Sequence, residues 1–366
     1  MTSQRVPGTA SAAPDRYSDG RPVATERLDA RDAGKIFRHG EGPDQCDGLG
    51  AREVSVVLHD GSYHLFYDGA EANTGWLACL ATSKDLETWE RHGKVLSYGE
   101  PGAPDSHTAT SPWFIHHDGL WHAFYVGCRQ TSPPPDCIPA GPYLTVKAEA
   151  GQLTGPWRKR YDVQVVTAEP GTYHATCASP GFVFQHDGEF WMFFSCGVDR
   201  ENPLGRMMHM RTLGLAHAPH PDGPWALLDA PVLSHQEQIE NSSLYYEPAN
   251  GWWFLFTNHV GVEETGYEWT DSIWVYWSKD PTKWDPTNKA IALDGENCTW
   301  SRRCVGMPSV LKIGDRLAMF YDAPGGDSRS HMRRDIGLAW YDLPLTPPAE
   351  EKAEQDAPAD ADRPRR

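Results

Sequence analysis

The chain alternates short apolar runs with polar turns, and one arrangement of these runs occurs five times. In each copy, an apolar run is followed by a polar turn and then by a second run that is rich in aromatic residues. The copies are EVSVVLHDGSYHLFYDG from Glu53, SPWFIHHDGLWHAFYVG from Ser111, SPGFVFQHDGEFWMFFSCG from Ser179, ENSSLYYEPANGWWFLFTN from Glu240 and MPSVLKIGDRLAMFYDAPG from Met307. Asp-Gly between alternating runs is a strong signal for a tight turn between antiparallel strands. The sequence therefore predicts five β-hairpins.

The predicted hairpins are evenly spaced along the chain. Their turns fall at Asp60, Asp118, Asp187, Asn250 and Gly314, at intervals of 58, 69, 63 and 64 residues. Weaker strand patterns follow each hairpin, and four of them contain a turn that ends in Trp, at Trp89, Trp157, Trp225 and Trp284. Such a period indicates radial repetition. We therefore predict an all-β fold, a five-bladed β-propeller in a single domain. A β-sandwich is the alternative, but it does not require even spacing.

The two ends of the chain lack this pattern. Residues 1–30 are rich in Ser, Ala, Pro, Asp and Arg without periodicity, and residues 347–366 are charged and rich in proline. Segments of this composition do not bury enough apolar surface to order themselves. We expect a propeller over residues 31–346 between two disordered arms.

The charge of the chain restricts its partners. The sequence contains 33 basic and 50 acidic residues, a net charge of -17. This balance argues against binding to nucleic acid or to an anionic membrane surface. No apolar run is long enough for a membrane helix, and the first residues lack the apolar stretch of a secretory signal, so we expect a cytoplasmic protein. The eight cysteines form no CxxC pair, which favours reduced, structural thiols over a zinc site.

Carboxylates stand at the start of two of the first strands. In a propeller these strands line the central channel, so the residues at their starts form a ring at its mouth. Alignment on the hairpin turns places Glu53 and Glu240 at equivalent positions, where other copies have Ser, Pro or Met. Two such carboxyls are the minimum apparatus for glycoside hydrolysis. The alternative is that each glutamate caps backbone amides or pairs with an arginine.

The sequence resembles the five-bladed glycoside hydrolases, the superfamily that includes families 43, 32, 62 and 117. The resemblance covers residues 45–346 and rests on two motifs. Arg52-Glu53-Val54-Ser55 resembles the family 43 pattern R-D-P-S, and Ile239-Glu240-Asn241-Ser242 resembles its pattern I-E-G-P. The resemblance implies that Glu53 is the base or nucleophile and that Glu240 is the general acid.

The chain departs from the family 43 pattern in blade three. The auxiliary Asp expected there falls near Ser179, so Asp47 or Asp105, each 13 residues before a hairpin turn, is a candidate for the missing carboxylate. In family 117 a His near the end of the propeller is thought to act as the acid, which makes His331 a rival to Glu240.

Further candidates for substrate contact lie near these motifs. Arg52 and Asn241 flank the two glutamates. Glu268, Trp269 and Asp271 lie on an expected loop of the fourth copy that could form a wall of the pocket, where an aromatic face stacks on a sugar. His107 and His174 both precede a Ser-Pro pair and could donate to sugar hydroxyls, although a role as plain loop residues is the simpler interpretation. The remaining candidates are Arg303 and Arg334.

We therefore expect a glycoside hydrolase that acts on a small neutral oligosaccharide or glycoside, with a furanoside slightly favoured by the resemblance. We expect no cofactor and no metal ligands, and nothing in the sequence supports an axial calcium ion. Two alternatives remain. One is a carbohydrate-binding propeller without catalysis. The other is a biosynthetic lyase, phosphorylase or cyclase; a phosphorylase would need the clustered Arg302, Arg303, Arg333 and Arg334 for phosphate.

Overall fold

The protein is built from β-strands. The computed structural model describes residues 23–201, 205–262 and 267–348. These residues contain no α-helix, only the short 3₁₀ turns η1 (Pro43–Gln45) and η2 (His235–Glu237). The predicted all-β class is therefore confirmed. The described part of the chain has no helical segment long and apolar enough to cross a membrane.

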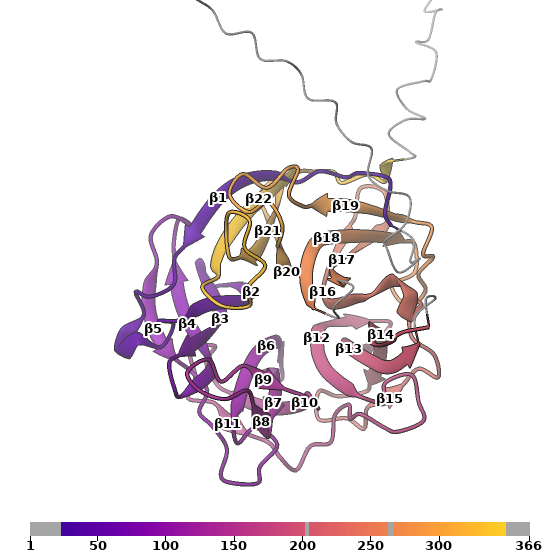
Figure 1. Ribbon diagram of the computed structural model, residues 1–366. Coiled ribbons are helices and arrows are strands. Elements are labelled where there is room, and N and C mark those ends of the chain that lie inside the picture. The colour runs from indigo at the N-terminus through magenta and orange to yellow at the C-terminus, as the bar shows by residue number, and fades with distance from the viewer. Residues whose placement is uncertain (1–22, 202–204, 263–266, 349–366) are drawn as a thin grey trace, which may run out of the picture.

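Consecutive strands pair into antiparallel sheets that surround a common centre (Figure 1). Two four-stranded meanders share one eight-stranded sheet, because β4 and β6 pair in parallel. Their strands are β2 (Gly50–His59), β3 (Ser62–Glu71), β4 (Gly75–Ser83) and β5 (Glu90–Lys94), then β6 (Thr108–His117), β7 (Leu120–Cys128), β10 (Leu144–Ala150) and β11 (Arg158–Lys159). A two-stranded insertion between β7 and β10 consists of β8 (Gln130–Thr131) and β9 (Pro139–Ala140).

The rest of the chain forms three separate four-stranded sheets. The first contains β12 (Cys177–His186), β13 (Glu189–Glu201), β14 (Met207–Ala218) and β15 (Ala226–Leu227). The second contains β16 (Ile239–Glu247), β17 (Trp252–Val262), β18 (Glu268–Ser278) and β19 (Lys289–Leu293). The third contains β20 (Gly306–Ile313), β21 (Arg316–Ala323), β22 (Asp335–Asp342) and β1 (Arg31–Phe37).

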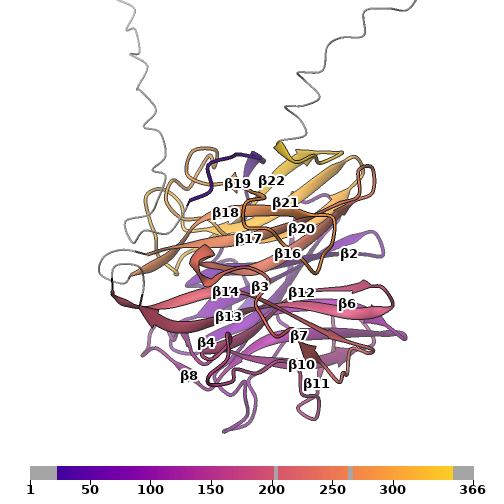
Figure 2. The same ribbon diagram turned by 90° about the vertical axis from the view of Figure 1, so that its right-hand side faces the viewer.

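The two ends of the ordered chain meet in this last sheet. Strand β1 pairs antiparallel with β22, so a segment from before the first hairpin supplies the outer strand of the last sheet. Both views show the two strands side by side at one edge (Figures 1 and 2). This pairing ties the start of the repeat to its end through backbone hydrogen bonds.

The ordered part begins earlier than expected from composition. Residues 23–30 pack on the sheet of β19, where Leu28 and Ala30 donate backbone N–H bonds of 2.9 Å to Ile291 and Ala292. The side chains of Ala24 and Leu28 are buried. The expectation of disorder up to residue 30 is therefore wrong for residues 23–30, because these apolar side chains find a hydrophobic partner. The arms at residues 1–22 and 349–366 lie outside the described residues.

The core lies between neighbouring sheets. One buried cluster joins residues of β2, β3 and β4 to residues of β21 and β22, and the other clusters join further neighbouring four-stranded units. Tyr67, Phe194 and Phe256 of the second strands are fully buried in this way. Because these strands contact neighbouring sheets on both faces, they appear in the sequence as nearly continuous aromatic runs.

The hairpin turns form as predicted. Asp60, Asp118 and Asp187 have φ values of 49°, 48° and 50°, and each precedes a glycine that also has positive φ. Positive φ at both central positions is the type I′ geometry that matches the twist of the flanking strands. The fourth turn is longer, because Gly251 bonds back to Glu247 in a turn that includes Asn250.

Each first strand has a β-bulge close to the centre of the molecule. The bulges follow Arg52, Thr110, Pro180, Glu240 and Gly306. The next residue is left-handed in four strands, with φ of 54° at Glu53, 51° at Ser111, 59° at Asn241 and 44° at Met307. The structural equivalent of Glu53 is therefore Asn241, and the equivalent of Glu240 is Arg52.

This register corrects the alignment on the hairpin turns. That alignment equated Glu53 with Glu240 by counting residues back from the turns. Because the fourth turn is longer than the others, this count does not reach equivalent residues of the two strands. The third sheet has Gly181 at the same place, and a Cβ there would lie 2.3 Å from Ser242 Oγ. A side chain, and with it a carboxylate, is sterically excluded from that position.

Candidate active site

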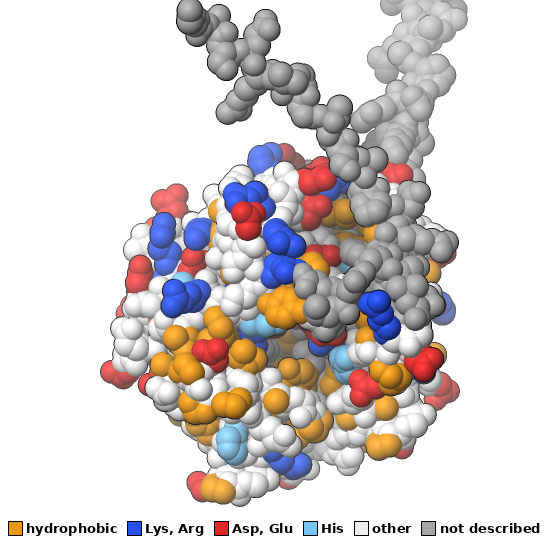
Figure 3. Space-filling view, viewed as in Figure 1, with side chains coloured by type: hydrophobic (Ala, Val, Ile, Leu, Met, Phe, Trp, Pro, Cys, Tyr) orange, Lys and Arg blue, Asp and Glu red, His pale blue; other side chains and the backbone are white. Residues whose placement is uncertain are grey.

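A pocket with a volume of about 230 Å³ lies where the bulges converge. The space-filling view shows that the face seen in Figure 1 is hollowed near its centre (Figure 3). Ligand pockets are typically about 300–1,000 Å³, so this one has room for a single small ring rather than a long ligand. Its wall carries the acidic residues Glu53, Asp68, Glu240 and Glu268, and the basic residues Arg52, Arg211 and Arg334.

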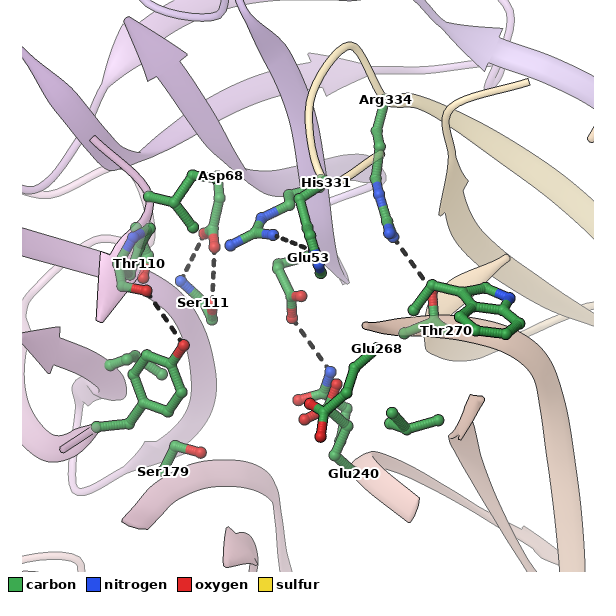
Figure 4. A pocket seen from close by; sticks show the side chains of 18 of the residues that line it. Glu53, Asp68, Thr110, Ser111, Ser179, Glu240, Glu268, Thr270, His331 and Arg334 are labelled. Atoms are coloured by element: carbon green, nitrogen blue, oxygen red, sulfur yellow. Dashed lines mark hydrogen bonds between the residues drawn. The ribbon is translucent and has the colours of Figure 1, made fainter. Parts of the chain in front are cut away.

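Glu53 and Glu240 are connected through two amide side chains. Asn241 Nδ2 donates to Glu53 Oε2 at 3.2 Å and to Asn258 Oδ1 at 2.9 Å. Asn258 Nδ2 in turn donates to Glu240 Oε1 at 3.3 Å. The close view shows Glu53 extending from β2 toward Glu240 and Glu268 (Figure 4). The two glutamates predicted from the sequence are 187 positions apart in the chain, and both face the same pocket.

The environment of Glu53 favours its neutral form. Burial, together with the nearby charges of Asp322, Asp68 and Glu240, raises the pKa of this carboxyl to about 8, against the opposing influence of Arg52. The backbone N–H of Glu53 donates to Asp322 Oδ2 at 2.7 Å, which holds the left-handed bulge in place. The carboxyl of Glu53 therefore keeps its proton more readily than an exposed glutamic acid does.

Asp68 is a further carboxyl that sequence reasoning missed. Both the backbone N–H and the Oγ of Ser111 donate to it, at 2.6 and 2.7 Å. Burial raises the pKa of Asp68 to about 7. A signal existed: Tyr67-Asp68 ends the first hairpin as Tyr321-Asp322 ends the fifth, and both aspartates bind the bulge of the next first strand.

Arg211 organises the other side of the pocket. Its Nε lies 3.0 Å from Glu240 Oε2, and its Nη1 pairs with Glu268. Arg211 stands inside β14, a strand that the sequence analysis treated as secondary. Glu268, Trp269 and Asp271, expected on a loop, instead begin strand β18. The ion pair with Arg211 involves the carboxylate form of Glu240. The two glutamates therefore occupy unlike environments.

The loop before β22 closes the pocket with Arg334 and His331. Arg334 is 2% exposed, and its Nη1 binds Asp322 Oδ1 at 2.6 Å. Burial and the charges of Arg52, Arg334 and Arg211 lower the pKa of His331 to about 3. His331 Nδ1 lies 3.4 Å from Arg52 Nη1. A neutral histidine beside three cations is a poor proton donor, so this setting weighs against the role of acid for His331.

Asp47 and Asp105 occupy positions away from the pocket wall. Asp47 is fully buried and accepts bonds from Gly40 and Gly42 N–H at 3.1 and 2.9 Å and from Arg91 at 2.9 Å. Asp105, also fully buried, accepts from Tyr125, Tyr161 and Lys159. Their equal spacing before the turns thus reflects a repeated structural contact, since each accepts a bond from a Tyr 20 residues later in the chain. Because of these contacts, neither carboxylate is free to replace the auxiliary Asp that the family 43 pattern expects near Ser179.

The remaining predicted contacts divide into two groups. Arg52, Asn241, Trp269 and Arg334 line the pocket. His107, His174, Asp271 and Arg303 do not.

Each residue of the second group has other surroundings. His107 is exposed beside Ser106, and Arg303 is exposed as well. His174 is buried between the rings of Tyr173 and Phe194, and Asp271 pairs with His259 at 2.7 Å. Plain loop and strand roles therefore suit these four residues.

Two groups of side chains with metal-ligand chemistry lie apart from the pocket. They are His117, Asp118 and His220, and His122, Glu149 and Asp222. In the second group, the ammonium of Lys147 already lies 2.5 Å from Asp222, in the place that a cation would take. Neither group shares a residue with the pocket wall.

Comparison with known proteins identifies the fold. No protein-family model matches the sequence, and neither does any curated protein. Among solved structures, a complex of BT0996 with RGII matches with a TM-score of 0.66 and 15% identity over 85% of this chain and 92% of the other.

Two further structures come from named families. The catalytic domain of a family 62 α-L-arabinofuranosidase from Coprinopsis cinerea matches at 0.56 and 15% identity, over 85% of this chain and 97% of the other. Zg3597, a family 117 glycoside hydrolase of Zobellia galactanivorans, matches at 0.56 and 14%, over 91% and 99%. The chain is thus similar in structure, over most of its length, to β-propeller glycoside hydrolases, and it shares their fold.

Proposed function

We propose that this protein is a glycoside hydrolase in which Glu53 and Glu240 form the acid/base pair, at the mouth of a propeller whose four-stranded units are five blades. The observation that carries the proposal is the amide connection from Glu53 through Asn241 and Asn258 to Glu240. This connection holds two carboxyls at the same small pocket, one of them buried with a raised pKa and the other in an ion pair with Arg211. Hydrolysis of a glycosidic bond needs this pairing of a proton donor with an ionised carboxylate.

The environments favour roles opposite to those that the resemblance implies. Glu53, whose pKa is raised to about 8 by burial, favours its protonated form and suits the general acid. Glu240, in its ion pair with Arg211, suits the base or nucleophile. In the proposed reaction, Glu53 gives its proton to the leaving oxygen, and Glu240 activates water or attacks the anomeric carbon. Asn241 and Asn258 keep the two groups in register.

Asp68 takes the place of the auxiliary carboxyl that the third sheet lacks. It is held by Ser111 beside Glu53, and its charge adds to the elevation of the pKa of Glu53. The third sheet has Ser179 where the resemblance expects that carboxyl. The chain thus reaches a similar set of carboxyls from a different strand.

The proposed substrate is a small glycoside or oligosaccharide that places one ring in the pocket. The arabinofuranosidase among the similar structures supports testing furanosides first. Trp269, whose ring faces Arg329 at 4.5 Å, and Tyr143 are the aromatic residues of the pocket wall. Aromatic surface of this kind packs against the apolar face of a sugar.

The test compares two substitutions on two kinds of substrate. With Glu53 as acid, Glu53→Gln should slow cleavage of glycosides with poor leaving groups by ~10²–10⁴-fold, but barely affect activated aryl glycosides. Glu240→Gln should slow both. Asp187→Asn, on an exposed hairpin turn, is the control. The opposite pattern would restore the roles implied by the resemblance, and full activity of both variants would reject the proposed pair.

A further inference from the structure

One cation on the pocket wall makes no salt bridge in the described part of the chain, although its charge acts on Glu53 and Asp68. Arg211 pairs with Glu240 and Glu268, and Arg334 pairs with Asp322. Arg52, in contrast, forms no ion pair with any residue in the described part of the chain. Its only hydrogen-bond partner there is the ring of His331, at 3.4 Å, and its Nε is buried without a partner. A buried charged donor left unsatisfied is costly, and native structures rarely retain one without a reason.

The guanidinium of Arg52 is held in a fixed plane. Its Cζ lies 4.2 Å from the centre of the Trp76 ring, and Trp76 is fully buried. Stacking covers one face of the guanidinium and leaves the N–H donors at its edge for a ligand. Arg52 is also the residue next to Glu53, so anything bound to it lies within the same pocket as the proposed acid.

We propose that Arg52 binds the carboxylate of an acidic sugar, so that the substrate of this site is a uronic acid glycoside. The inference rests on the proposed function and replaces the neutral sugar expected from the sequence. A planar carboxylate matches the fork of a guanidinium with two parallel hydrogen bonds. A single unpaired arginine among several carboxyls suits one negative charge better than the two of a phosphate group.

The neighbouring acidic groups are compatible with an anionic ligand. Glu53 and Asp68 are nearest to Arg52 in the chain or across the β2–β3 pair, and burial raises the pKa of both, to about 8 and about 7. A protonated Glu53 does not repel a carboxylate, and Ser111 engages Asp68 through two hydrogen bonds. Glu240 and Glu268 are both engaged by Arg211. Arg52 is therefore the arginine of the pocket wall that a ligand can contact without breaking a salt bridge.

Binding can be measured with matched pairs of free sugars. The full-length protein is titrated calorimetrically with D-galacturonic acid against D-galactose and D-glucuronic acid against D-glucose, with sodium acetate and sodium sulfate as simple anions. At least one uronic acid should bind roughly 10–100-fold more tightly than its neutral partner, the range expected for hydrogen bonds to a charged group. Arg52→Gln should abolish the preference, and Arg52→Lys should keep part of it. Arg302→Gln, on the exposed Arg302–Asp327 pair, should change nothing.

The outcomes separate this inference from the proposed function. Equal affinity for acid and neutral sugars, or a preference that survives in Arg52→Gln, overturns the acidic-sugar site. A preference shared by acetate and sulfate overturns it as well, because it then reflects simple anions. If nitrophenyl uronides and neutral glycosides are cleaved equally well, the hydrolase stands and the inference falls. If uronic acids bind through Arg52 but no glycoside is cleaved, the inference stands and the hydrolase falls. Thermal melting confirms that each variant is folded.

Discussion

Asn241 occupies in β16 the bulge position that Glu53 occupies in β2, and its amide donates to Glu53 across the pocket at 3.2 Å. The same amide nitrogen lies 2.9 Å from Asn258 Oδ1, and Asn258 reaches Glu240. Equivalent points of two sheets thus carry different side chains that meet at the centre. The repeated strand geometry fixes where the two side chains lie. The different residue types at these equivalent positions allow one side chain to donate a hydrogen bond to the other.

This relationship predicts the effect of removing the amide. Asn241→Gly keeps the left-handed backbone, which glycine adopts without strain, and deletes only the side chain. Catalytic groups displaced by about 1 Å can lose roughly 10²-fold in rate, and we expect a loss of kcat/KM on that order with little change in Tm. Asn73→Gly is the matched control, since Asn73 is an exposed residue with φ of 63°. Unchanged kinetics in Asn241→Gly would show that the amide connection is dispensable.

The pKa of Glu53 predicts a pH profile for catalysis. If Glu53 is the acid, its proton is needed, and kcat/KM should decline about tenfold per pH unit as the pH rises above about 8. If Glu53 is the base, kcat/KM should instead rise toward pH 8. The profile is measured on a substrate with a poor leaving group between pH 5 and pH 10. An alkaline limb that persists unchanged in Glu53→Gln must come from another group.

The same pKa predicts a pH dependence of stability. The folded state raises the pKa of Glu53 from 4.5 to about 8, so the folded state binds this proton more tightly than the unfolded chain does. The contribution is fully present below pH 4.5 and is lost as the pH rises toward 8. Glu53→Gln removes this loss. Its Tm should therefore exceed that of the unsubstituted protein by more at pH 8 than at pH 5, by about 5 °C.

A control and a contrary outcome sharpen that comparison. Glu100→Gln, on the exposed surface, should show the same Tm difference at both pH values. If the Tm of Glu53→Gln relative to the unsubstituted protein falls between pH 5 and pH 8, Glu53 is stabilised as a carboxylate. The assignment of Glu53 as the acid then fails with it.

The Asp322–Arg334 pair is expected to hold the pocket together. Both side chains are almost fully buried, and Asp322 also accepts the N–H of Glu53. Arg334→Met should cost about 3–5 kcal/mol, because it leaves the Asp322 charge buried without its partner. The free energy of unfolding is measured by denaturant titration. Arg31→Met, in an exposed pair with Asp342, should leave it nearly unchanged. Equal effects of the two substitutions would contradict a buried ion pair at Arg334.

The sequence by itself determined the hairpins and two members of the site. Asp-Gly turns and aromatic runs are local patterns, and a strand pair joined by two residues forms between neighbours in the chain. Their even period indicated the radial repetition, and the carboxylates absent from other copies pointed to Glu53 and Glu240. Both do line the pocket.

Only the tertiary structure decided the register of the bulges and the partners in the pocket. A bulge adds one residue and carries no fixed sequence signature, so the shift that pairs Glu53 with Asn241 could not be counted from the turns. Asp68, Arg211 and Glu268 come from three different sheets and meet because those sheets surround one centre. Asp47 and Asp105 show the converse, since identical spacing marked a structural contact. Burial, which sets the pKa of Glu53, is a property of the assembled ring and of no segment alone.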